Sequence, residues 1–172
     1  MSRHIATFLV GGTLLGLDIL AVKEVYRHMN LTPIPGAPGH FCGIMNLRGK
    51  VVTVIDLSVC LDLTPSAAEE KRLLILKTNS ELARCRITGK LENANLGEDT
   101  IGFLINRMEE VLIVEDDEIL PAPSNLDILE KNLICGVVKL KDRLVILLDV
   151  TAVLEGVAAA STMLSKESGQ ET

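Results

Sequence analysis

Short apolar runs, each interrupted by glycine, proline or charged residues, follow one another along most of this chain. Residues Ala6 to Val10 and Leu73 to Lys77 have the composition of buried strands. Each is followed by a second apolar run that begins at Gly16 or Gly102 and then by a proline-containing loop. The pattern predicts a mostly β protein with many short strands and short helices.

The second half of the chain repeats the first. Residues 42–61 align without a gap with residues 135–154, and residues 16–25 match residues 102–111 in the same order. The identical pairs in the longer match are Cys42/Cys135, Gly43/Gly136, Leu47/Leu140, Val52/Val145, Asp56/Asp149 and Leu61/Leu154. What the two copies share is expected to serve the fold, so Gly16, Gly43 and Gly136 are predicted to be structural.

Each copy contains a hairpin and a capping aspartate. The hairpin turns are Leu-Arg-Gly-Lys at 47–50 and Leu-Lys-Asp-Arg at 140–143, in which glycine and aspartate supply turn chemistry. Asp56 and Asp149 each precede a short helical pattern, Leu57 to Leu61 and Val150 to Leu154. Because an aspartate oxygen accepts unpaired amides at a helix start, both are predicted to be N-caps and therefore structural.

The few strands of one half cannot form a stable sheet with one wet face. Curled sheets that close on themselves and share a core solve this problem, so we predict two pseudo-repeated β-barrels. The first is expected at about 15–65 plus crossing strands, and the second at about 72–150. Residues 64–71 read as a polar bridge and 79–100 as a mobile insertion, while 157–172 are expected to form a short helix and a disordered tail.

Composition narrows the classes of partner. Aromatic residues make up only 2% of the chain, and the net charge of -6 opposes binding to nucleic acid or an anionic membrane. The apolar run from Ile5 to Leu17 resembles a secretory signal, but it lacks a cleavage site and belongs to the repeat. The mean hydropathy of +0.34 favours apolar surface for protein contacts, and no direct membrane insertion is expected.

The motifs of catalytic and metal sites are missing from the sequence. The four cysteines form no Cys-x-x-Cys pair and are predicted to be buried thiols. The acidic residues between 109 and 118 are predicted to be solvated charges at a strand edge. We expect no catalytic site, cofactor or metal. Two alternatives stay open: a ligand- or metal-binding barrel using His40, Cys42 and Cys135, and an enzyme using Asp56 and Asp149.

Arg48 is the charged residue at the tip of the first hairpin. As a single surface cation it would contribute little to stability. Arginine is also enriched at protein interfaces, because its planar fork binds carboxylates while its stem covers apolar surface. A helical partner with an acidic or amide residue on an apolar stripe would satisfy both properties.

Taken together, the motifs resemble those of the CheW-like chemotaxis coupling proteins. The resemblance runs from about residue 5 to 155 and rests on Gly16-x-Asp-Ile-x-x-Val-x-Glu-Val25, Pro33-Ile-Pro35, Gly43-x-x-Asn-Leu-Arg-Gly49, the strand 51–57, and Gly136-Val-x-Lys-Leu140 to Leu147-Leu-Asp149. It implies two intertwined five-stranded SH3-like β-barrels in a domain covering 3–156. It also implies a non-catalytic adaptor in the bacterial cytoplasm, which links the hairpin tip of methyl-accepting receptors to the regulatory domain of the histidine kinase CheA.

The resemblance also implies roles for individual residues. The turn is similar to the family's coupling region, which makes Asn46, Leu47, Arg48 and Gly49 candidate protein-binding residues. The positions that resemble those lining a groove for a receptor helix are Val22, Glu24 and Val25. A pathway with another output, such as twitching, is the alternative within the family.

Overall fold

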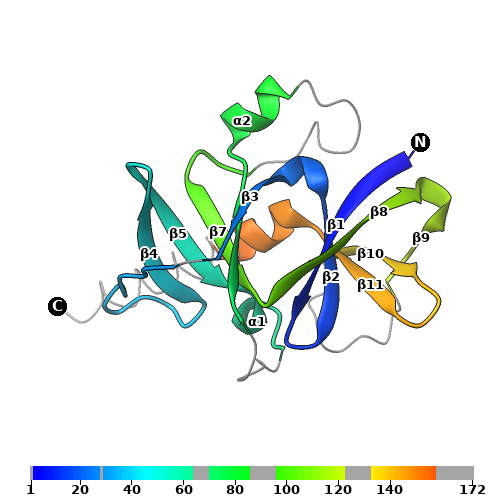
Figure 1. The fold of residues 1–172 in the computed structure, drawn as a ribbon, viewed down its shortest axis with the longest axis horizontal. Coiled ribbons are helices and arrows are strands. Elements are labelled where there is room, and N and C mark those ends of the chain that lie inside the picture. Colours follow the sequence, from blue (N-terminus) through cyan, green and yellow to red (C-terminus); the bar gives the residue numbers. More distant parts are fainter. Residues whose placement is uncertain (1, 28, 64–69, 86–95, 123–132, 158–172) are drawn as a thin grey trace.

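Short strands make up most of the computed structural model, which describes residues 2–27, 29–63, 70–85, 96–122 and 133–157 (Figure 1). The strands are β1 (Ser2–Val10), β2 (Thr13–Asp18), β3 (Val22–Tyr26), β4 (Phe41–Leu47), β5 (Lys50–Asp56), β6 (Arg72–Leu76), β7 (Thr100–Ile105), β8 (Arg107–Glu115), β9 (Ile119–Leu120), β10 (Ile134–Lys139) and β11 (Leu144–Leu148). The short helical elements are η1 (Ile19–Ala21), α1 (Leu57–Cys60), α2 (Asn79–Arg84) and η2 (Asp116–Glu118). Residues 150–157 are also helical.

The two halves of the chain exchange strands. One sheet has the order β8-β1-β2-β11-β10-β9 and the other β3-β6-β7-β5-β4. The first two strands of each half therefore lie in the sheet that contains the other half's hairpin. They join it through the parallel pairs β2–β11 and β5–β7. The predicted intertwined, mostly β fold is confirmed, with the short β9 giving one sheet a sixth strand.

The ranges expected for the two barrels, about 15–65 plus crossing strands and about 72–150, stay predictions. Strand β2 pairs with β11, and β6 and β7 pair with β3 and β5, so each sheet contains strands from both halves. The reason is physical: the repeat in the sequence marks the copied unit, whereas hydrogen bonding joins strands from both copies. Closure of each sheet into an SH3-like barrel stays a prediction.

Three hydrophobic clusters hold the sheets together. One lies against the six-stranded sheet and includes Ile5, Val114 and Val145. A second lies against the five-stranded sheet and includes Met45 and Ile75. The largest combines residues of both sheets with α1, Leu82 of α2 and the helix at 150–157, which lies at the centre of Figure 1. Burial between the sheets thus makes each half dependent on the other.

The repeated glycines leave room where strands cross. A Cβ on Gly16 would lie 2.7 Å from Cγ2 of Ile5, and one on its counterpart Gly102 would lie 2.6 Å from Cδ1 of Leu73. At Gly136 an added Cβ would meet Ile119 at 2.5 Å. Gly43 has a φ of +146°, and a Cβ there would lie 2.5 Å from the carbonyl oxygen of Thr32. Any side chain at these positions must displace its neighbours.

Two sequence predictions need correction. The stretch 79–100 was expected to be a mobile insertion, but it begins with α2, and Leu82 and Leu96 are buried in the shared cluster. The prediction of buried thiols is wrong for Cys85 and Cys135, whose residues are exposed, and Cys42 and Cys60 are only partly buried. In both cases local composition was a poor guide, because the neighbouring elements decide what is covered.

Other predictions fall partly or wholly outside the described residues. Residues 64–69 of the predicted bridge 64–71, residues 86–95 of the predicted insertion 79–100 and residues 158–172 of the predicted tail lie outside the described residues. The helix expected at 150–154 extends to 157. Among the residues that the structure describes, no helix is long and apolar enough to cross a membrane.

Candidate protein-binding site

The hairpin tip between β4 and β5 has a left-handed backbone. Leu47 and Lys50 are paired across the turn, and the two residues between them, Arg48 and Gly49, have φ values of 52° and 83°. Positive φ at both central positions is the signature of a type I′ turn, whose twist suits the flanking strands. Asn46 completes it by accepting a hydrogen bond from the Gly49 amide at 3.0 Å through Oδ1. Asn46 and Gly49 therefore shape the turn that presents Arg48.

The second copy of the hairpin has a different tip. Leu140 donates its amide to the carbonyl of Arg143 at 2.8 Å, so a turn forms at the equivalent place. Among the described non-glycine residues, however, only Arg48 and Asp62 have positive φ. Lys141, the counterpart of Arg48, is not in a left-handed conformation. The tip geometry thus belongs to the first copy alone.

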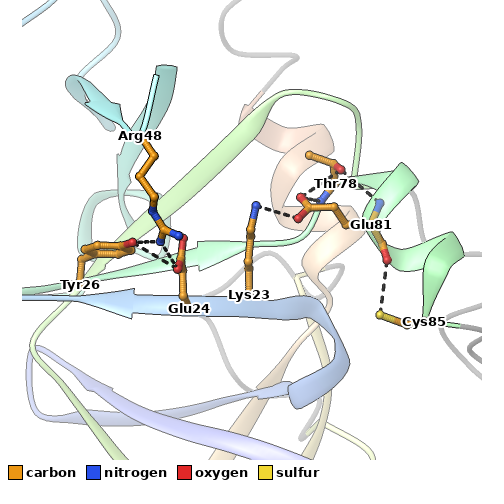
Figure 2. Close-up of polar contacts among 7 residues, drawn as sticks. All are labelled: Lys23, Glu24, Tyr26, Arg48, Thr78, Glu81 and Cys85. Carbon is orange, nitrogen blue, oxygen red and sulfur yellow. Dashed lines mark hydrogen bonds and ion pairs between the residues drawn. The ribbon is translucent and has the colours of Figure 1, made fainter. Parts of the chain in front are cut away.

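Arg48 folds back onto strand β3 (Figure 2). Its Nη2 donates to Oε2 of Glu24 at 2.5 Å and also to the hydroxyl of Tyr26. Tyr26 in turn donates to the same carboxylate oxygen at 3.2 Å, and the guanidinium carbon lies 5.6 Å from the Tyr26 ring centroid. Because β3 and β4 are the outer strands of the five-stranded sheet, this cluster joins its two edges.

Solvent limits what this ion pair adds to stability. The Arg48 side chain is 67% exposed and that of Glu24 is 27% exposed. Exposed ion pairs typically contribute about 0.2 to 1 kcal/mol. The cluster therefore orients Arg48 more than it stabilises the fold, and most of the Arg48 side chain stays accessible to solvent.

A pocket of about 160 Å³ opens beside the cluster. Its apolar wall includes Val52 and Ile75, which are both fully buried. The polar side chains around it come from β3, the hairpin and the start of β7: Lys23, Glu24, Arg48, Lys50 and Thr100. The pocket thus combines an apolar floor with four charged side chains around it, three of which are cationic.

A second ion pair, between Lys23 and Glu81, joins β3 to α2 (Figure 2). Nζ of Lys23 lies 2.7 Å from Oε2 of Glu81. The other oxygen of Glu81 accepts hydrogen bonds from the amide and hydroxyl of Thr78 in a capping box. Partial burial of Glu81 opposes ionisation, but the hydrogen bonds from Lys23 and Thr78 outweigh it and lower the pKa of Glu81 from 4.5.

The predicted groove residues of β3 differ in exposure. Val22 is partly buried and packs against the shared cluster, whereas Val25 is 38% exposed. Two residues of η1 just upstream, Ile19 and Leu20, are also exposed apolar side chains. Val25 is paired with Leu74, whereas Glu24 and Tyr26 are paired with Ile75 and Leu73, so Val25 lies on the opposite face of β3 from the charged cluster.

Sequence reasoning missed Tyr26, Lys23, Glu81 and Lys50. The spacing Thr78-x-x-Glu81 is a capping-box signal that marks the start of α2. No sequence signal identifies Tyr26 or Lys50, because their roles depend on how the hairpin lies over β3.

The alternative metal or ligand site does not assemble. Over the described part of the chain, no group of three or more His, Cys, Asp and Glu side chains is placed to hold a metal ion. Cys42 lies on β4 and Cys135 on β10, in different sheets. Burial, reinforced by Asp56, raises the pKa of Cys42 to about 11, and burial lowers the pKa of His40.

The two repeated aspartates are engaged in capping. Oδ1 of Asp56 accepts from the Ser58 amide at 2.9 Å, and Oδ1 of Asp149 accepts from the Ala152 amide at 3.1 Å. Each carboxylate thus satisfies the start of the helix that follows it. This geometry gives the enzymatic alternative no converging pair of catalytic groups.

Comparison with known proteins identifies the family. The model of the CheW-like domain matches residues 4–158. The chain belongs to the CheW-like family. The chemotaxis protein CheW of Rhizobium meliloti is 25% identical over 151 residues, covering 88% of this chain and 86% of the relative. That of Helicobacter pylori is 28% identical over 149 residues, covering 86% and 79%.

A solved structure agrees with the fold. The scaffolding protein TtCheW from Thermoanaerobacter tengcongensis matches with a TM-score of 0.72 and 26% identity, covering 89% of this chain and 88% of the other. Together these comparisons confirm the predicted CheW-like fold and the predicted class, a non-catalytic chemotaxis coupling adaptor. The roles of individual residues stay predictions.

Proposed function

We propose that this CheW-like adaptor works in the bacterial cytoplasm and couples methyl-accepting chemoreceptors to the histidine kinase CheA. In this proposal the hairpin tip of a receptor docks along strand β3 and the adjoining turn, where it contacts Arg48, Glu24 and Val25. The regulatory domain of CheA binds at the ends of the barrels. Asn46, Leu47 and Gly49 hold the β4–β5 turn of this chain in shape. Family membership supports the pairing of partners, and the geometry of the tip supports the choice of surface.

The observation that carries the proposal is the presentation of Arg48. A left-handed turn, found in the first hairpin and not in its copy, directs this arginine onto Glu24 and Tyr26 of β3. Tyr26 and Glu24 hold one nitrogen of the guanidinium, which restricts the side chain before any partner arrives. Preorganisation of this kind reduces the entropy lost on binding.

Calorimetric titration of the full chain with a receptor hairpin, and separately with the CheA regulatory domain, tests the proposal. We expect Arg48→Glu to weaken receptor binding by at least about tenfold, since it places two carboxylates together. Lys141→Glu is the matched control, because it makes the same charge change at the equivalent tip. Unchanged binding of both partners by Arg48→Glu would remove the assigned role of the arginine.

A double variant with exchanged charges distinguishes direct contact between Arg48 and the partner from support of the fold by the ion pair. Glu24→Arg combined with Arg48→Glu retains an ion pair between the turn and β3 but reverses its orientation. If Arg48 contacts the partner, the double variant stays defective; if the ion pair only supports the fold, binding returns.

A further inference from the structure

Within the described residues, the pocket beside the Arg48 cluster contains one more cation than there are carboxylates paired with its cations. Three cationic side chains line it, Lys23, Arg48 and Lys50. Lys23 pairs with Glu81 and Arg48 pairs with Glu24. No carboxylate in the described part of the chain pairs with Lys50. An exposed lysine is commonplace on a surface, but this one lies at the rim of a pocket that already holds two cations.

The donors of Arg48 are also incompletely used. Both of its hydrogen bonds come from Nη2, so Nε and Nη1 bond to none of the described residues. Arginine has five N–H donors in a rigid plane, which suits a carboxylate that approaches from the side opposite Glu24. Lys50 follows Arg48 by two residues, directly after the turn, and lines the same pocket.

The apolar floor of the pocket strengthens the interaction of its cations with an incoming carboxylate. Val52 and Ile75 form part of the wall and are shielded from water. Charges meeting over an apolar surface interact more strongly than charges in bulk water, because the effective dielectric constant is lower. A pocket of about 160 Å³ has room for one acidic side chain.

We infer that this pocket receives a single aspartate or glutamate side chain from the receptor hairpin, held by Lys50 together with the unused donors of Arg48. The inference rests on the proposed function and adds the chemistry of the partner residue and a further specificity-determining residue. A receptor that lacks an acidic residue at that position binds less tightly.

The test compares Lys50→Gln with Arg143→Gln in titrations with a receptor hairpin. Arg143 is the exposed counterpart of Lys50 in the second hairpin, so both variants change the net charge equally. We expect Lys50→Gln to weaken binding about threefold to tenfold and to reduce its salt dependence, as for a partly desolvated ion pair. Arg143→Gln is expected to bind as the unmodified chain does. Equal thermal midpoints for both variants exclude a folding defect.

Charge reversal on both proteins identifies the receptor carboxylate that Lys50 binds. Lys50→Glu is expected to bind the hairpin more weakly than Lys50→Gln, and one acid-to-lysine change near the receptor tip should restore binding. If Arg48→Glu abolishes binding while Lys50→Gln leaves it unchanged, this inference is wrong and the proposed function stands. If Lys50→Gln weakens only the CheA regulatory domain, the assignment to the receptor is overturned. If the unmodified chain binds no receptor hairpin, the proposed function itself fails.

Discussion

Arg48 occupies a backbone position that disfavours its residue type, and this gives a sharp test of the turn. An L-amino acid with a side chain loses about 1 to 2 kcal/mol in the left-handed region, whereas asparagine and glycine tolerate it better. Arg48 has a φ of 52°, the first central position of a type I′ turn, where asparagine is preferred. We expect the side-chain contacts of Arg48 to be the reason for an arginine at this position, although its backbone conformation lowers the free energy of unfolding.

The expected changes follow from two opposing terms. Arg48→Ala keeps the unfavourable φ and loses both the exposed ion pair and the contact with the Tyr26 ring, so it should destabilise the fold by about 1 kcal/mol. Arg48→Asn loses the same contacts but removes about 1 kcal/mol of backbone strain, and its stability should stay close to that of the unmodified chain. The two variants should therefore differ by about 1 kcal/mol, or about 2 to 4 °C in Tm for a chain of this length.

Urea unfolding followed by circular dichroism measures this difference. The chain has no tryptophan and one tyrosine, so fluorescence is a poor probe. Lys141→Ala and Lys141→Asn are the controls, and we expect them to be equally stable because the second tip lacks a left-handed residue. Equal midpoints for Arg48→Ala and Arg48→Asn would refute the reasoning. Loss of receptor binding in a fully stable Arg48→Asn would assign the arginine to the partner rather than to the fold.

Three further predictions concern packing, pH and thiol reactivity. Gly43→Ala should lower the free energy of unfolding by more than about 2 kcal/mol, because its Cβ would meet a carbonyl oxygen at 2.5 Å; Gly39→Ala, with open space around it, should be nearly neutral in the same denaturation assay. Because the pKa of Glu81 is lowered on folding, ionised Glu81 contributes fully to the free energy of unfolding above pH 4.5, and this contribution is lost as the pH falls further. The free energy of unfolding should therefore fall less with acid in Glu81→Gln than in the unmodified chain. Identical profiles of stability against pH would contradict this. Burial raises the pKa of Cys42 to about 11, so mass spectrometry after brief alkylation at about pH 8 should find the exposed Cys85 modified before Cys42, and the reverse order would be inconsistent with the burial described.

The repeat made much of the architecture predictable. Matching positions such as Asp56 and Asp149 identified the hairpins and the helices that follow them, because turn and cap chemistry are local. Strand exchange between the halves agreed with the family resemblance. The ranges of the individual sheets did not follow from the repeat, since hydrogen bonding between strands depends on contacts far apart in the sequence.

The surroundings of Arg48 show where sequence reasoning ends. The sequence placed an arginine at a hairpin tip, with Gly49 permitting the turn and Asn46 beside it. Glu24 and Tyr26 lie more than 20 residues upstream, and they reach Arg48 only because the hairpin folds over β3. The pairing of Lys23 with Glu81 depends in the same way on the position of α2 against that strand.

The sequence by itself determined the mostly β fold, the duplication, the local turns and caps, and the resemblance to chemotaxis coupling proteins. Each of these depends on neighbouring residues or on an ordered set of motifs, which the linear chain displays directly. Only the tertiary structure decided which strands share a sheet, what holds Arg48 in place and why Lys50 lines a pocket in which no carboxylate of the described residues pairs with it. Those features arise from packing between distant segments, where the free energy of burial selects one arrangement among many that the same local signals permit.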